Sequence, residues 1–225
     1  MKTRIPLALL AAALMHAPAG AQTFYFTGTG AIPDDVSGNP GCGTPRVLTT
    51  DSNAVNPIQD VVLTIAMNHT FVGDLRIRLS YTPTGSATTT TSWVINRAGA
   101  DVPNGIGSGN DVNGNFTFVV GATSFNSAAT TVSTLTFGVY SPFANNFNGT
   151  FPVVEFADFF RGLPGGGTWT LTIEDCAFAD FGAVTSASIA VQARPIACLA
   201  DFNTDGVVNT ADLTFFLGRF GGTCQ

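Results

Sequence analysis

The amino-acid sequence predicts an all-β protein, a jelly-roll β-sandwich with a small C-terminal calcium loop-helix appendage. Residues 23–193 are dominated by Thr, Ser, Asn, Gly, Val and Phe, which is the composition of strands and turns. Several short segments within them alternate apolar and polar residues. Near the end, DFNTDGVVNTAD (residues 201–212) gathers three aspartates and two asparagines around one glycine, in a chain that is only 11% charged.

The first 21 residues have the pattern of a signal peptide. Lys2 and Arg4 give a positive start, residues 7–14 are apolar, and Ala19-Gly20-Ala21 forms an A-x-A cleavage site. We therefore expect the mature chain to begin at Gln22 and the protein to be secreted or attached to the cell surface. No later segment offers about 18 uninterrupted apolar residues, so no membrane span is expected in the mature chain.

Period-two alternation predicts strands at residues 61–67, 75–81, 92–97, 116–120, 134–140, 168–175 and 184–192. In LRIRLSY (75–81) every apolar side chain falls on one face, and two arginines and a serine fall on the other. TWTLTIED (168–175) repeats this pattern, and turn sequences such as Asn-Gly and Pro-Gly-Gly-Gly separate the strands. Short strands with one buried face pack as two antiparallel sheets, so we predict a jelly-roll sandwich over residues 22–193.

Four cysteines remain in the exported chain: Cys42, Cys176, Cys198 and Cys224. An even count in an exported protein indicates two disulfides, which three pairings could form. We favour Cys198 with Cys224, because they bracket the acidic loop, and therefore Cys42 with Cys176. The C-terminal bridge would contribute about 3 kcal/mol on the chain-entropy model. The cysteine spacing and the single mature histidine do not fit a zinc site.

The composition of the sequence and its apolar spacing change near residue 195, which we take as the boundary of a tail at residues 196–225. Apolar residues there recur at the spacing i, i+3, i+4 and i+7, namely Leu213, Phe216, Leu217 and Phe220. This spacing predicts a short amphipathic helix after the acidic loop. Gly221 and Gly222 would end it.

The acidic loop has the donor pattern of a calcium site. Counted from Asp201, oxygen-bearing side chains fall at positions 1, 3, 5, 9 and 12, and position 7 offers a backbone carbonyl; the ligands would be Asp201, Asn203, Asp205, Val207, Asn209 and Asp212. Position 6 is a glycine, where the chain must turn sharply. Oxygen donors in this order suit Ca²⁺ better than Mg²⁺. The alternative is a series of Asx-turns with no metal.

Charge excludes nucleic acid as a partner. Without Lys2 and Arg4 the chain keeps seven arginines and no lysine against fifteen acids, a net charge near −8. Such a chain has no basic patch that could neutralise a phosphate backbone. Anionic membrane surfaces are disfavoured for the same reason.

Catalytic residues are not expected. His69 is the one histidine of the mature chain, so a Ser-His-Asp unit would have to use it, with Asp74 as a neighbour in sequence. The two glutamates, Glu155 and Glu174, have no sequence context that places them in one cleft, which argues against glycoside hydrolysis. We therefore expect a protein that is not an enzyme.

The tail resembles a type I dockerin repeat, on the loop pattern D-x-N-x-D-G-x-V-N-x-x-D that residues 201–212 contain. Dockerins pair two loop-helix repeats and bind cohesin modules on scaffold proteins. This chain has a single repeat within a match of about 28 residues. The resemblance therefore implies a dockerin-like C-terminal anchoring tail, of the kind that sorts or attaches secreted bacterial proteins.

The main domain resembles the P domain (P/Homo B) of proprotein convertases. The motifs are AIPDD (31–35), MNHTFVGDLRIRLSYTPTG (67–85) and LPGGGTWTLTIEDCAFADFGAV (163–184). The matching residues are His69, Thr70, Gly73, Asp74, Leu75, Pro83, Gly85, Gly167, Trp169, Leu171, Asp175, Asp180 and Gly182. This resemblance also implies a jelly-roll sandwich and a structural role for His69. We interpret Asp175 and Asp180 as turn-forming or capping residues, with a second calcium site as the alternative.

These features favour an exported, non-catalytic binding or stabilising module attached through a calcium-dependent tail. Its partner would be a protein or glycan at the cell surface, including a cohesin-like or sorting component. One alternative is an accessory P domain that acts with a separately encoded subtilisin-like serine protease. Another is a carbohydrate-binding module, for which buried Trp93 and Trp169 would be contrary observations. Fold alone does not choose between these functions.

Overall fold

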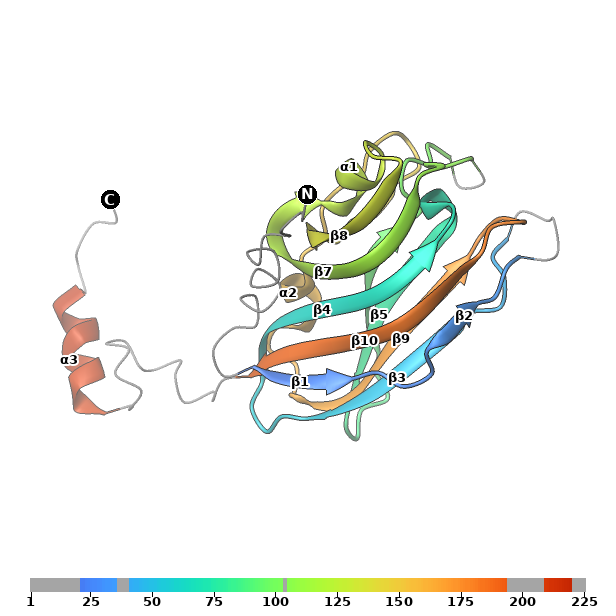
Figure 1. The fold of residues 1–225 in the computed structure, drawn as a ribbon. Helices are drawn as coiled ribbons and strands as arrows, with labels where there is room; N and C mark the ends of the chain where they lie inside the picture. The colour runs from blue at the N-terminus through green and yellow to red at the C-terminus, as the bar shows by residue number, and fades with distance from the viewer. Residues whose placement is uncertain (1–20, 36–40, 103–104, 194–208, 220–225) are drawn as a thin grey trace, which may run out of the picture.

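The computed structural model describes residues 21–35, 41–102, 105–193 and 209–219, and over these residues the chain is all-β. Figure 1 shows two β-sheets stacked as two layers, with short helices at their margins. The fold class predicted from the sequence is confirmed at this level. Within the described residues, no helix is both long and apolar enough to cross a membrane.

The first sheet has six strands in the order β1-β10-β4-β7-β8, with β2 also paired to β10. Its strands are β1 (Gln22–Tyr25), β2 (Gly30–Ile32), β4 (Ile58–His69), β7 (Asp111–Ser124), β8 (Thr134–Ser141) and β10 (Gly182–Ala193). The second sheet has four strands in the order β3-β9-β5-β6. Its strands are β3 (Arg46–Asn53), β5 (Leu75–Pro83), β6 (Thr90–Asn96) and β9 (Gly166–Asp175).

All seven predicted strands are present, with two corrections. Arg97, expected to end a strand, lies just beyond β6 with a φ of 52°. The sheets are also not wholly antiparallel, because β7 and β8 pair in parallel. The helix α1 (Phe125–Ala129) follows β7, and the chain then enters β8 at Thr134, which pairs with Asp111 at the start of β7. This return through a helix is what makes a parallel pair.

The core lies between the two layers and is filled by the inward residues of both sheets. The apolar residues of segment 75–81 are all fully buried, as their alternation predicts. Trp169 stacks on Tyr81 with ring centroids 4.2 Å apart and meets the edge of Phe160 at 5.0 Å. The indole N–H of Trp169 donates to Ser52 Oγ at 3.1 Å, so its burial leaves no polar atom unpaired.

Two short helical elements complete the sandwich. The helix α2 (Phe156–Phe160) places Phe156 and Phe160 in the core. The 3-10 helix η3 (Val72–Asp74) links β4 to β5 and crosses between the two sheets. Its residues are buried, and they bring Asp74 into the polar region described below.

A disulfide joins Cys42 to Cys176, which is the predicted pairing for these two cysteines. It ties the segment before β3 to the end of β9, across a sequence separation of 134 residues. The backbone beside it is also fixed, since Gly43 N–H donates to Asp175 O at 2.7 Å. Cys198 and Cys224 lie outside the described residues, so their pairing stays a prediction.

The predicted tail helix is present as α3 (Thr210–Arg219). Leu213, Phe216 and Leu217, members of its apolar stripe, are 40–57% exposed. Phe220, the fourth member, lies outside the described residues.

Candidate functional site

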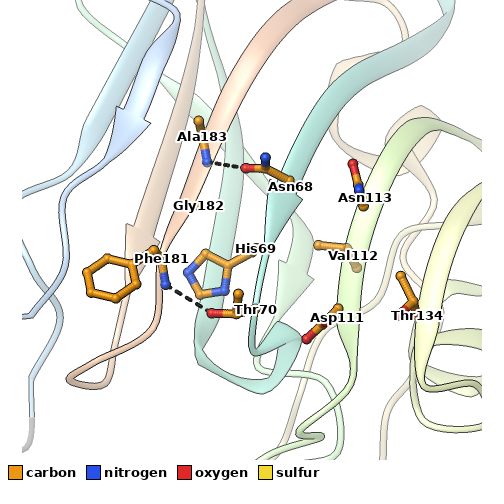
Figure 2. Close-up of a pocket in the computed structure, with 10 residues that line it drawn as sticks. All are labelled: Asn68, His69, Thr70, Asp111, Val112, Asn113, Thr134, Phe181, Gly182 and Ala183. Carbon is orange, nitrogen blue, oxygen red and sulfur yellow. Dashed lines mark hydrogen bonds between the residues drawn. The ribbon is translucent and has the colours of Figure 1, made fainter.

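A pocket of about 550 Å³ opens at one end of the first sheet, where β4 ends and β7, β8 and β10 begin. Figure 2 shows its lining on these four strands and in the residues next to their ends: Asn68, His69, Thr70, Asp111, Val112, Asn113, Thr134, Phe181, Gly182 and Ala183. Polar side chains and one exposed aromatic ring dominate this list. Pockets with a few convergent polar groups are the default candidates for binding sites.

Strand pairing brings the polar side chains of the pocket together. Asn68 on β4 pairs with Asn113 on β7, and Asp111 on β7 pairs with Thr134 on β8. Val112, between Asp111 and Asn113, is buried, so these two polar residues share the outer face of β7. The four side chains therefore stand in two cross-strand pairs on the outside of the sheet, and the Cβ atoms of the antiparallel Asn68–Asn113 pair are roughly 5 Å apart.

Hydrogen bonds to the backbone fix the β10 side of the pocket. Asn68 Oδ1 accepts a bond from Ala183 N–H at 2.8 Å, as Figure 2 shows. Thr70 Oγ1 accepts a bond from Phe181 N–H at 3.0 Å and donates to Asp180 Oδ1 at 2.9 Å. These contacts set the backbone position from which the Phe181 ring extends.

Gly182 allows β10 to approach β4 at this place. A Cβ at residue 182 would collide with Asn68 O and with the His69 ring. The glycine is therefore required by close packing between the strands.

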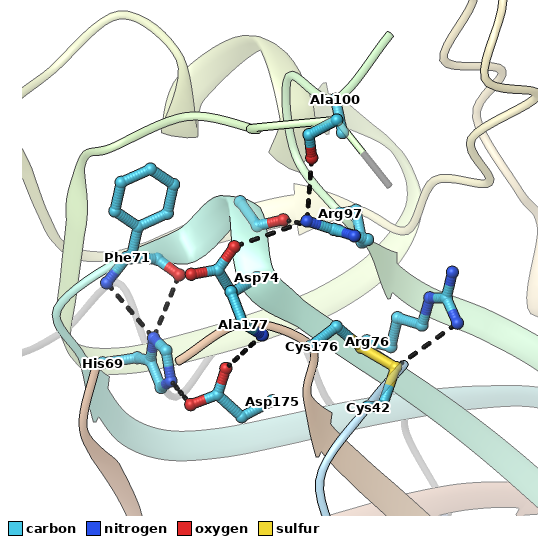
Figure 3. A network of polar contacts seen from close by, with 12 residues as sticks. Cys42, His69, Phe71, Asp74, Arg76, Arg97, Ala100, Asp175, Cys176 and Ala177 are labelled. Atoms are coloured by element: carbon cyan, nitrogen blue, oxygen red, sulfur yellow. Dashed lines mark hydrogen bonds and ion pairs between the residues drawn. A yellow bond between two sulfur atoms is a disulfide. The ribbon is translucent and has the colours of Figure 1, made fainter. Parts of the chain in front are cut away.

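Beneath the pocket, His69 is held in a buried polar network (Figure 3). The His69 Nε2–H donates to Asp175 Oδ2 at 3.0 Å, and both side chains are 0% exposed. Its Nδ1 lies 3.0 Å from Phe71 O and 3.2 Å from Phe71 N. Both ring nitrogens thus have protein partners, and the imidazole serves as a link between η3 and β9. The predicted neighbour Asp74 is not the residue that His69 contacts.

Asp74 instead pairs with Arg97 in the same buried region, with Asp74 Oδ1 3.5 Å from Arg97 Nη2. The guanidinium also donates to Gly73 O at 3.1 Å from Nε and to Gly105 O at 2.9 Å from Nη2. Burial raises the pKa of the Asp74 carboxyl from 3.8 to about 6; Arg97 opposes the rise, while Asp175 adds to it. Burial likewise lowers the pKa of the Arg97 guanidinium, against the pull of Asp74.

Asp175 makes a turn contact of the kind expected, whereas Asp180 bonds a side chain that is distant in the sequence. Asp175 Oδ1 accepts a bond from Ala177 N–H at 3.3 Å, and Asp180 accepts the Thr70 hydroxyl. Within the described ranges, no group of three or more His, Cys, Asp or Glu side chains could hold a metal ion.

The two glutamates lie on different elements, β9 and the start of α2, and the two tryptophans contact other protein side chains. Glu174 accepts a bond from Arg78 Nη2 at 3.0 Å, and Glu155 is exposed at the start of α2. Trp169 is fully buried, whereas Trp93 is only partly buried on β6, with its ring 5.6 Å from the Arg78 guanidinium. The expected burial therefore holds for Trp169 and not for Trp93.

The predicted calcium ligands lie in the tail. Asp201, Asn203, Asp205 and Val207 fall outside the described residues, so the calcium site stays a prediction. Asn209 and Asp212 are described and form a reciprocal cap at the start of α3. Asn209 Oδ1 accepts a bond from Ala211 N–H, and Asp212 Oδ2 accepts one from Asn209 N–H, both at 2.7 Å. The cap makes the helix begin at the place where the last ligand of the loop would stand.

The sequence singled out His69, Thr70 and Gly182 but assigned no site role to the polar residues around them, and the Asn-Gly pair at 113–114, expected to form a turn, lies within β7. Asn68 and Asn113 carried a signal in hindsight, because each occupies an outward position in an alternating strand. Their pairing across β4 and β7 could not be read from either strand alone. In comparisons with known proteins, no protein-family model, no curated protein and no solved structure matches this chain.

Proposed function

We propose that this protein is an exported, non-catalytic binding module, which presents a ligand pocket on a β-sandwich and is attached through a calcium-dependent dockerin-like tail. The observation that carries the proposal is the pocket at the ends of β4, β7, β8 and β10. Its polar groups point outward on a rigid sheet, and rigid elements hold a binding site better than loops do. The strand orders of the two sheets support the jelly-roll topology of a P-domain-like module.

The surroundings of His69 support a non-catalytic role. A general base must reach the proton that it removes, within hydrogen-bond distance of the reacting group. His69 is fully buried, and both of its ring nitrogens already contact protein atoms. Its hydrogen bond to Asp175 orients the two strands rather than a nucleophile.

The tail is the part of the chain to which we assign attachment, whereas ligand recognition belongs to the pocket on the sandwich. Residues 201–212 supply six oxygen donors at the spacing of a calcium loop. The capping contacts of Asn209 and Asp212 define the start of the helix that follows. Calcium would order the loop against this helix, and the ordered tail would bind a cohesin-like or sorting component of the cell envelope.

The test is a pull-down with the mature chain as bait, from the cell envelope of the producing organism, with Ca²⁺ or with EDTA. We expect a partner that is retained in Ca²⁺, released by EDTA and not retained by the double variant Asp201→Ala, Asp205→Ala. The purified chain should hydrolyse neither peptide nor glycoside substrates. Turnover that disappears in His69→Ala, while the variant keeps its fold by circular dichroism, would show that the protein is an enzyme.

A further inference from the structure

Four hydrogen-bonding groups in the pocket have no partner within the part of the chain that the structure describes. The side chains of Asp111, Asn113 and Thr134 make no hydrogen bond there, and neither does the amide nitrogen of Asn68. All four belong to the two cross-strand pairs described above. Together they offer amide N–H donors, amide and carboxylate acceptors, and a hydroxyl that can do both.

An exposed aromatic ring stands beside these groups. The Phe181 side chain is 69% exposed, and it follows the turn that Thr70 and Asp180 fix by hydrogen bonds. A flat apolar ring next to amides and hydroxyls suits a ligand that has both C–H faces and hydroxyl groups. A sugar ring has this combination, since its axial C–H bonds can lie on an aromatic face while its hydroxyls point sideways.

The charges around the pocket select among such ligands. Among the described residues, no Lys or Arg lines it, and Asp111 and the neighbouring Asp180 both carry carboxyl groups. Phosphorylated, sulfated or uronic acid ligands would meet negative charge with no cation to pair with. A neutral sugar would donate its hydroxyl hydrogens to the Asp111 carboxylate without such a cost.

The pocket is also arranged before any ligand arrives. Asn68 is held by Ala183, Thr70 by Phe181, and the buried His69–Asp175 contact fixes the end of β4 from below. These contacts fix the backbone of the site, and a site with a fixed backbone loses less conformational entropy on binding.

From this juxtaposition we infer that the pocket binds a neutral saccharide, with Phe181 contacting the ring face and Asn68, Asp111, Asn113 and Thr134 hydrogen-bonding its hydroxyls. The inference rests on the proposed function, of which it names the ligand class. It assigns recognition to a pocket at the end of the sheet rather than to a tryptophan platform.

Affinity electrophoresis of the chain from Gln22 to Gln225 tests this inference. The gels would contain soluble starch, xyloglucan, galactomannan or mixed-linkage β-glucan, with polygalacturonic acid as the acidic arm. We expect retardation by at least one neutral polysaccharide and none by polygalacturonic acid. Phe181→Ala and Asn113→Ala should each weaken binding about tenfold, because each removes a ring contact or one to two hydrogen bonds.

Two matched variants serve as controls. Phe178→Ala removes a ring that is 64% exposed in the same loop but does not line the pocket. Asn53→Ala removes an exposed asparagine from β3 in the other sheet. Both should bind as the original chain does, and the thermal midpoints of all four variants should show that they are folded.

The outcomes are distinguishable. Binding that is equally strong in Phe181→Ala and Asn113→Ala, or that prefers polygalacturonic acid, overturns the saccharide inference. If no polysaccharide binds while the calcium pull-down still retains a partner, the saccharide inference is wrong and the proposed function stands. If a neutral polysaccharide binds through the pocket while the pull-down retains nothing, the saccharide inference stands and the attachment role is wrong.

Discussion

Asp74 is the residue whose ionisation is most clearly coupled to the fold. Its side chain is only 4% exposed and faces Arg97, with His69, Asp175 and Asp180 near enough to influence it. Removal from water disfavours the charged carboxylate, and Arg97 compensates for this only in part, so the pKa of Asp74 rises to about 6. The folded protein therefore holds this proton more tightly than the unfolded chain does.

This coupling predicts the sign of a pH effect on stability. Since the pKa of Asp74 is about 6 in the folded chain against 3.8 as the ordinary value, the folded state binds more protons between these values. The contribution of Asp74 to the free energy of unfolding is fully present below about pH 4 and is lost as the pH rises through about 6. The loss is up to about 3 kcal/mol. Urea unfolding at intervals from pH 4 to pH 7.5 should show this decline in the original chain.

Asp74→Asn provides the comparison. The variant loses the charged partner of Arg97 and should be less stable, but its free energy of unfolding should vary less with pH across the same interval. The test is the slope of the free energy of unfolding against pH. A lower free energy of unfolding alone would follow from any damage to the Asp74–Arg97 pair. Parallel pH profiles for the two chains would contradict the coupling.

At the scale of single residues, the sequence predicted the structural roles of polar residues better than it predicted which residues they contact. His69 and Asp175 were expected to be structural, and their hydrogen bonds agree. The contact of His69 with Asp175 rather than Asp74 was missed, because 106 residues separate the pair and only the packing of β4 against η3 and β9 brings them together. Phe181 was missed because an exposed aromatic in a loop has no periodic pattern.

At the scale of the secondary-structure elements, the close approach of β10 to β4 depends on a glycine. Gly182 pairs with His69 in the ladder, and the space for a Cβ is filled by Asn68 O and the His69 ring. We expect Gly182→Ala to destabilise the protein by about 2 kcal/mol, since these backbone and buried ring atoms have little room to move. Chemical denaturation measures the loss, and saccharide binding should weaken as the pocket shifts.

Gly218→Ala is the control for this substitution. Gly218 lies in α3 with open space around its Cβ position, so alanine should stabilise that helix by about 1 kcal/mol or less. The two Gly→Ala changes thus have opposite expected signs. A Gly182→Ala chain as stable as the original would show that β4 and β10 can separate without cost.

Element type was predictable where periodicity extends over several residues, and element pairing was not. The strands with clear alternation, such as β5 and β9, were identified with boundaries within a few residues. β1 and β2 have four and three residues, too few for a period-two pattern to stand out. The parallel pairing of β7 with β8 follows from the chain returning through α1, and alternation contains no information about strand direction.

At the scale of the whole molecule, calcium should act on the tail and leave the sandwich intact. The six predicted ligands all lie within residues 201–212, whereas the core is built from residues 24–191. We expect EDTA to reduce the helical signal of the full chain in far-ultraviolet circular dichroism and leave its β signal unchanged. The double variant Asp201→Ala, Asp205→Ala should give the reduced signal even in millimolar Ca²⁺. A spectrum that does not respond to EDTA would mean that residues 201–212 form turns without metal.

The two disulfides should likewise act on separate parts of the molecule, one stabilising the sandwich and the other the tail. Cys42–Cys176 closes a loop of 134 residues that contains most of both sheets, and chain entropy gives such a bridge about 4–5 kcal/mol of stabilisation. Cys42→Ser with Cys176→Ser should therefore lower the main unfolding transition of the sandwich. Cys198→Ser with Cys224→Ser should leave that transition in place, because the predicted second bridge closes only the tail. Calorimetry of the two double variants distinguishes these effects, and equal shifts of the main transition would show that tail and sandwich unfold as one unit.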